Sequence, residues 1–167
     1  GLVFSWLWAF LGRRKLDPSG PVKFALGMAQ LGLGFLALYY GASHPDSRGM
    51  VSVSWLLLGY LLHTTGELCL SPVGLSLVTK LSPQNLVSTM MGAWFLATAF
   101  SGFLAGQIAK LTGVSEGEDG KVLPPPMDTL STYGEVFQII AYTALVSGGI
   151  LLLISPVLKR WMHLSPE

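Results

Sequence analysis

The chain has 167 residues, of which 51% are hydrophobic and 11% are charged, and its formal net charge is +1. A soluble domain carries roughly 25% charged residues, so this composition favours a membrane protein and gives no general attraction to nucleic acid. The single cysteine, Cys69, supplies neither a disulfide framework nor a cysteine metal site, and we expect it only to pack.

Residues 1–11 form an apolar and aromatic segment that is too short to span a membrane, which takes about 20 residues. We interpret it as the end of a transmembrane helix, because Arg13, Arg14 and Lys15 follow the apolar run, whereas a signal peptide carries its charges first. Residues 12–21 then form a basic loop rich in proline and glycine, which indicates the cytoplasmic side. We therefore expect the chain to lack the N-terminal part of a longer protein.

Four further segments are long and apolar enough to span a bilayer, and they predict an all-α integral membrane protein. The expected spans are residues 22–41, 51–81, 86–110 and 132–159. The expected connections are an external loop over 42–50, a cytoplasmic turn over 82–85, an external loop over 111–131 and a cytoplasmic tail over 160–167. Most Lys and Arg residues then fall on one side, which places the C-terminus in the cytoplasm.

Small residues within the spans indicate where helices pack closely. Gly27, Gly32 and Gly34 are expected to lie where a neighbouring backbone approaches. Gly102 and Gly106, at four-residue spacing, are expected to do the same in a later span, although this spacing is common by chance.

Glu67 is an acidic residue at membrane depth in the span 51–81. A charged side chain at the centre of a membrane helix costs about 2.5–3.5 kcal/mol on insertion scales, so such a residue usually faces a partner or water. Lys80 lies about 20 Å further along the helix, which is too far for an ion pair. Glu67 is therefore expected to be protonated, paired with a cation outside this sequence, or paired with substrate; a structural hydrogen bond is the alternative. Pro72 predicts a bend next to it.

His63, Glu67 and Ser71 recur at four-residue spacing, with Thr64 and Gly74 near the same face. This stripe predicts a polar cavity lining and a transport site. For His63, a hydrogen bond from a buried neutral ring to a neighbouring helix is the more common role, and the Ser71 hydroxyl could instead bond a carbonyl one turn earlier.

Trp94 and Phe95 follow the cytoplasmic turn by about two helical turns, so we expect them close to the depth of Glu67, where aromatic rings would suit a ligand. Packing is the commoner role of such rings. No motif for ATP hydrolysis, zinc chemistry or acyl transfer is present, so the sequence predicts neither an enzyme nor a metal or cofactor site.

Residues Gly66 to Ser76, GELCLSPVGLS, resemble the tenth transmembrane helix of bacterial proton-dependent oligopeptide transporters, a family of the major facilitator superfamily. Residues 4–8 with the basic turn resemble the end of helix eight, residues 23–27 the start of helix nine, and residues 91–96 helix eleven. The resemblance covers essentially the whole chain. It implies the C-terminal helical bundle portion of such a transporter.

The resemblance also implies a function, a proton-coupled symporter that imports di- and tripeptides through the cell inner (plasma) membrane. In the family, the glutamate that matches Glu67 binds the peptide amino terminus or a proton, and residues that match Ser71, Trp94 and Phe95 line the side-chain pocket. The implied partners are small peptides, protons, the lipid bilayer and an N-terminal half of the same transporter, with no cofactor and no nucleic acid. Two alternatives stay open: a major facilitator carrier for an amine, nitrate or drug, and a non-transporting membrane scaffold subunit.

Overall fold

A computed structural model describes residues 6, 10, 12–14, 18–110 and 126–162 of the chain. Within these ranges it contains the helices α2 (Gly20–Ala42), α3 (Val53–Leu81), α4 (Val87–Lys110) and α5 (Pro126–Trp161). All four are long and apolar enough to cross a membrane. The expectations for residues 1–11 and for most of the loop 111–131 and the tail 160–167 lie outside the described residues.

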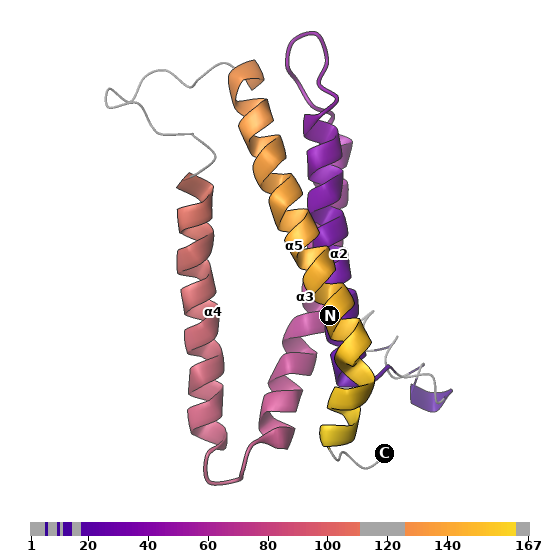
Figure 1. Cartoon of the computed structure of the whole chain (residues 1–167), viewed down its shortest axis with the longest axis vertical. Coiled ribbons are helices and arrows are strands. Elements are labelled where there is room, and N and C mark those ends of the chain that lie inside the picture. The colour runs from indigo at the N-terminus through magenta and orange to yellow at the C-terminus, as the bar shows by residue number, and fades with distance from the viewer. Residues whose placement is uncertain (1–5, 7–9, 11, 15–17, 111–125, 163–167) are drawn as a thin grey trace.

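Helix α2 is the centre of the bundle, because both α3 and α5 pack along it (Figure 1). The loop from α2 to α3 lies at one end of the bundle, and the turn from α3 to α4 lies at the other (Figure 1). Helix α4 stands apart from α2 and α5 and meets α3 near that turn. The helical fold is thus three packed helices and a fourth held at one end.

The loop from α2 to α3 is short and tightly bonded. The Asp46 carboxylate accepts hydrogen bonds from the backbone N–H groups of Arg48, at 2.9 Å, and Met50, at 2.8 Å. Gly49 has φ 76°, a left-handed conformation that favours glycine. Ser52 then caps α3 by accepting a hydrogen bond from the Ser54 N–H group. These local bonds fix where α2 ends and α3 begins.

Glycines at seven-residue spacing give α2 a smooth face toward α3. Seven residues are close to two helical turns, so these glycines follow one another along one side of the helix. A Cβ atom added to Gly20 would lie 2.8 Å from Leu77 Cδ1, and one added to Gly41 would lie 2.8 Å from Trp55 Cβ. The four glycines meet large side chains of α3 in antiparallel order: Gly20 with Leu77, Gly27 with Leu70, Gly34 with His63 and Gly41 with Trp55. The close approach expected at Gly27 and Gly34 is confirmed.

A second small-residue contact joins α2 to α5. A Cβ atom on Gly32 would lie 3.1 Å from the backbone oxygen of Ala141, and one on Gly148 would lie 3.3 Å from that of Ala25. Ala25 and Ala141 are buried at this contact. The close approach expected at Gly32 is therefore also confirmed, with α5 as its neighbour.

Helix α4 differs from the other helices because none of its residues is buried within the described part of the chain. Nothing lies within 4 Å of a Cβ atom added to Gly102 or Gly106. The prediction that this pair packs against another helix is therefore not met among the described residues. The sequence pattern marked a surface that can pack, but it did not identify a neighbour.

Helix α5 begins at Pro126, so the expectation of a loop through residue 131 is wrong for residues 126–131. Proline is tolerated in the first turn of a helix, where its missing N–H group would have no helical acceptor. Residues 126–131 therefore form the first turn and a half of the helix.

Candidate functional site

Glu67 lies on a side of α3 that no described helix covers, and its side chain is exposed. The carboxylate makes no hydrogen bond or ion pair with any residue in the described ranges. This placement differs from that of Gly66 and Cys69 on the same helix, which are buried against α2. The carboxylate is thus available to a cation or a proton from outside the packed helices.

Two of the other residues in the expected polar stripe share this exposed side. Thr64 and Ser71 are both exposed, three residues before and four residues after Glu67. The Thr65 hydroxyl donates to the backbone oxygen of Leu61 at 2.8 Å, whereas Ser71 has no hydrogen bond to a described residue. The Ser71 hydroxyl is therefore open to a ligand rather than bonded to its own helix.

His63 does not join Glu67 on the open side, although the spacing suggested that it could. Its ring covers Gly34 and lies 4.5 Å, centroid to centroid, from the ring of Phe35 on α2. Each four-residue step turns the side chain by about 40° around the helix, so a stripe of three residues drifts across the surface. His63 is at the edge that meets α2, and it packs there.

Trp94 lies at the contact of α4 with α3. Its ring occupies the space that a Cβ atom on Gly74 would need, and Gly74 is buried. Gly74 follows Glu67 by seven residues, about 10 Å of helix, so Trp94 lies nearer to the α3–α4 turn than we expected. Phe95 is 58% exposed and remains on the uncovered surface of α4.

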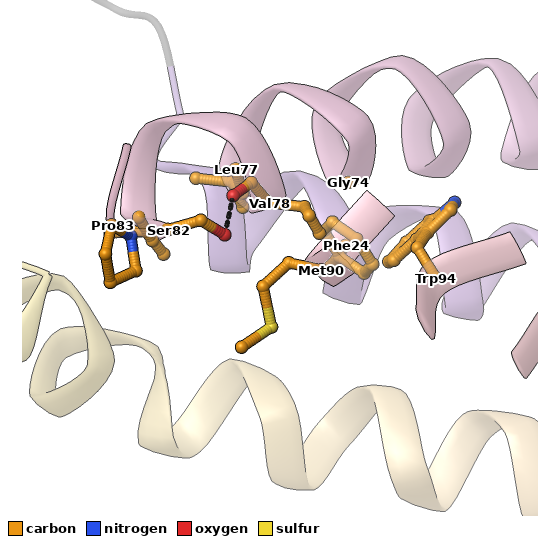
Figure 2. Close-up of a pocket in the computed structure, with 9 residues that line it drawn as sticks. Phe24, Gly74, Leu77, Val78, Ser82, Pro83, Met90 and Trp94 are labelled. Atoms are coloured by element: carbon orange, nitrogen blue, oxygen red, sulfur yellow. Dashed lines mark hydrogen bonds between the residues drawn. The ribbon is translucent and has the colours of Figure 1, made fainter. Parts of the chain in front are cut away.

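A pocket of about 380 Å³ lies between Trp94 and the α3–α4 turn. Its walls come from α2, α3 and α4, and they include Phe24, Leu77, Val78 and Met90 (Figure 2). The Ser82 hydroxyl, at the edge of the pocket, donates to the backbone oxygen of Val78. The lining is therefore almost entirely apolar, and it suits a hydrocarbon or aromatic group.

Two polar atoms are buried at the contact of α2 with α3 and were not singled out as a pair by the sequence. Gln30 Oε1 and His63 Nε2 have no hydrogen-bond partner within the described residues. The Gln30 amide donates weakly to Cys69 Sγ, at 3.9 Å, and Cys69 is only 2% exposed. The expectation that Cys69 packs is confirmed. The described ranges contain no group of three His, Cys, Asp or Glu residues that could hold a metal ion.

Comparison with solved structures defines the class of protein. The chain matches tetrameric PepTSo2 with a TM-score of 0.71 and 27% identity, over 96% of this chain and 30% of that one. It matches a bacterial homologue of the human drug peptide transporters PepT1 and PepT2 with a TM-score of 0.69 and 28% identity, over 96% and 31% of the two chains. The four helices therefore match part of the fold of peptide transporters of the major facilitator superfamily.

The family follows from sequence. Residues 2–123 match the family described as PTR2, the POT family, so the chain belongs to the POT family of peptide transporters. It is 42% identical to dipeptide and tripeptide permease A of Edwardsiella piscicida over 84% of this chain and 28% of the relative. It is 41% identical to the uncharacterized transporter YclF of Bacillus subtilis (strain 168) over 96% of this chain and 29% of the relative. The chain thus spans about three tenths of the length of these relatives, and it belongs to a transporter family, not to an enzyme family.

Proposed function

We propose that this chain forms the C-terminal part of a proton-coupled symporter that imports di- and tripeptides across the inner membrane. The observation that carries the proposal is the exposed Glu67 carboxylate near the middle of α3, a helix that is long and apolar enough to cross a membrane. Membrane helices keep an ionisable group at this depth chiefly for a ligand, an ion or a proton. Relatives named as dipeptide and tripeptide permeases supply the substrate class.

Glu67 has two roles in this proposal. Its carboxylate binds the ammonium group of the peptide, and in the absence of peptide it takes up a proton or pairs with a cation elsewhere in the transporter. Thr64 and Ser71 flank it on the same exposed side and offer hydroxyl groups to the peptide. Trp94 and Phe95 supply aromatic surface for the peptide side chain. His63 supports the site from behind, because it packs against Gly34 and Phe35.

The site must open to one side of the membrane and then to the other, and ligand binding can drive this change. A ligand shifts a conformational equilibrium only through its different affinities for the two states. We propose that a proton arriving from outside and the peptide ammonium together weaken the pairing between the two halves of the transporter, so that the site opens to the other side.

The test is dipeptide uptake into proteoliposomes by the complete transporter that carries this segment, driven by a proton gradient. Glu67→Gln keeps the size of the side chain but removes its charge, so we expect gradient-driven uptake to fall at least about tenfold, the effect of 1.4 kcal/mol. Glu135→Gln is the matched control, since Glu135 is an exposed glutamate near the start of α5 and lies outside the proposed site.

Full uptake by Glu67→Gln would remove the proposed role of this carboxylate. Competition decides the substrate class: unlabelled dipeptides should suppress uptake of a labelled dipeptide, whereas amines or nitrate should not. Transport of an amine, nitrate or drug without competition by dipeptides would favour the other kind of carrier. A scaffold subunit would transport none of these.

A further inference from the structure

Three helices meet at Gly74. A Cβ atom added to Gly74 would lie 2.8 Å from Trp94 Cζ2 on α4 and 2.9 Å from Phe24 Cζ on α2, and Trp94 Cη2 lies closer still. The tips of both rings therefore converge on one glycine of α3. Figure 2 shows Phe24 and Trp94 near Gly74 at one end of the pocket.

At this meeting point α4 contacts α3 in the described part of the chain. No residue of α4 is buried, and its neighbouring large side chains are exposed, Phe95 by 58%, Leu96 by 71% and Phe100 by 59%. Trp94 is half-buried, and the tips of its ring and of the Phe24 ring both reach the space beside Gly74. The indole can take this position because Gly74 has no side chain, and Phe24 is the residue of α2 that reaches the same space.

We propose that Phe24 is a positioning residue that braces the Trp94 indole on Gly74 and so sets how much room the indole leaves for the peptide side chain, which would lie on the side of the indole away from the apolar pocket. The inference rests on the proposed function, in which Trp94 contacts the peptide side chain. Phe24 itself does not need to touch substrate. The pocket of about 380 Å³ is lined by both rings and extends from them toward the α3–α4 turn. The indole therefore has free space to enter when the side chain of Phe24 is replaced by a shorter one.

Two substitutions should move the indole in opposite directions. Phe24→Leu shortens the brace, so the indole moves further into the apolar pocket and becomes less accessible. Gly74→Ala places a methyl group where the indole lies, so the ring is pushed away from α3 and becomes more accessible. Phe24→Met, which nearly preserves the length of the side chain, should leave the indole close to its original position.

The readout is Trp94 fluorescence in the complete transporter, in a variant in which Trp6, Trp8, Trp55, Trp161 and every tryptophan outside this chain are replaced by phenylalanine. We expect Phe24→Leu to shift the emission to shorter wavelength and to reduce quenching by acrylamide. We expect Gly74→Ala to do the reverse. Phe100→Leu is the control, because Phe100 is an exposed aromatic residue on the same helix as Trp94, and it should change neither quantity.

Peptide selectivity then tests the consequence for transport. Gly74→Ala should raise the KM for a dipeptide with a large aromatic side chain about tenfold relative to dialanine, the lower end of what one methylene costs in an apolar pocket. Phe24→Leu should lower the same ratio, and kcat should change little in either variant. If Gly74→Ala does not fold, the comparison of Phe24→Leu with Phe24→Met still decides whether Phe24 positions the indole.

The outcomes separate the two proposals. If the Trp94 emission of Phe24→Leu is the same as that of the parent protein, the proposal that Phe24 positions the indole is wrong. Shifted emission with an unchanged selectivity ratio also overturns the positioning role, while dipeptide uptake by the parent protein leaves the proposed function standing. No dipeptide uptake by the parent protein overturns the proposed function, and the fluorescence shifts then report on the brace alone.

Discussion

Gly66 shows how closely single residues control the packing of α3 on α2. A Cβ atom at this position would lie 2.9 Å from the backbone oxygen of Gly27 and 3.3 Å from Gln30 Cβ. A backbone oxygen in a packed helix cannot rotate away as a flexible side chain can. The two helices must therefore separate to admit a methyl group.

We expect Gly66→Ala to destabilise the chain by about 1–3 kcal/mol, the usual cost of overpacking a tight contact. Thermal unfolding of the chain in detergent measures the change. Gly149→Ala is the matched control on α5, where nothing lies within 4 Å of the new Cβ atom, so helix propensity alone should leave its stability equal or slightly higher. A melting temperature that is equal in the two variants would show that α2 and α3 are not so close.

The side-chain oxygen of Gln30 is buried, and replacing this residue should stabilise the chain, in contrast to replacing Gly66. Its Oε1 atom is buried without a partner in the described part of the chain, and its amide group donates only a weak bond to Cys69. Leaving a buried polar atom unpaired costs about 1–3 kcal/mol. Gln30→Met keeps the shape of the side chain and removes this atom, so the melting temperature should rise. A lower melting temperature would mean that the oxygen binds a group the structure does not describe.

The residues of the site could be predicted from the sequence only in part. The apolar surroundings of Glu67 made it stand out, and the side of α3 that carries it is indeed uncovered. The orientation of His63 could not be predicted, because a four-residue spacing does not say which edge of the stripe meets a neighbour. Phe24 was missed because it is one apolar residue among many, and only the meeting of three helices gives it a role.

At the scale of the elements, α3 is one unbroken helix although it contains a proline. The helix runs from Val53 to Leu81 with Pro72 inside it, and the proline has no N–H group to donate to the carbonyl of Leu68. Neighbouring groups in membrane proteins often compensate for a freed carbonyl, so the cost is smaller than in a soluble helix. The bend expected at Pro72 remains a prediction.

Pro72→Ala should restore the missing bond and raise the free energy of unfolding by up to about 3 kcal/mol. If flexibility here serves transport, the same variant should lower kcat for dipeptide uptake by the complete transporter while KM changes little. Thermal unfolding and uptake kinetics measure the two effects. Unchanged kcat in a stabilised variant would show that transport does not use a bend at Pro72.

The arrangement of the helices was less predictable than their existence. Long apolar runs mark the spans, but the sequence does not say that α2 lies between α3 and α5. A signal for this was present in Gly20, Gly27, Gly34 and Gly41, whose seven-residue spacing gives α2 a continuous smooth face. Gly32 lies on another side of α2, where it meets α5. Small residues on two sides of one helix predict two closely packed neighbours.

The whole molecule is asymmetric in charge along the bundle. At the end that holds the α3–α4 turn and the end of α5, the described residues carry Lys80, Lys159 and Arg160. At the other end, the loop from α2 to α3 carries Asp46 and Arg48, and α4 ends at Lys110. Basic residues near the ends of spans favour the cytoplasmic side, so this asymmetry predicts that the α3–α4 turn is cytoplasmic and that the Asp46 loop is external.

Labelling of single cysteines tests this orientation. In a Cys69→Ser background, Ser47→Cys places a thiol in the exposed loop from α2 to α3, and Gln84→Cys places one in the exposed α3–α4 turn. A maleimide that does not cross membranes should label Ser47→Cys in intact spheroplasts, and it should label Gln84→Cys only after permeabilisation. The two sites are connected by the single helix α3, so one of them must be reached first if the helix spans the bilayer. Labelling in the reverse order would place the α3–α4 turn outside the cell and would contradict the orientation predicted from the charges.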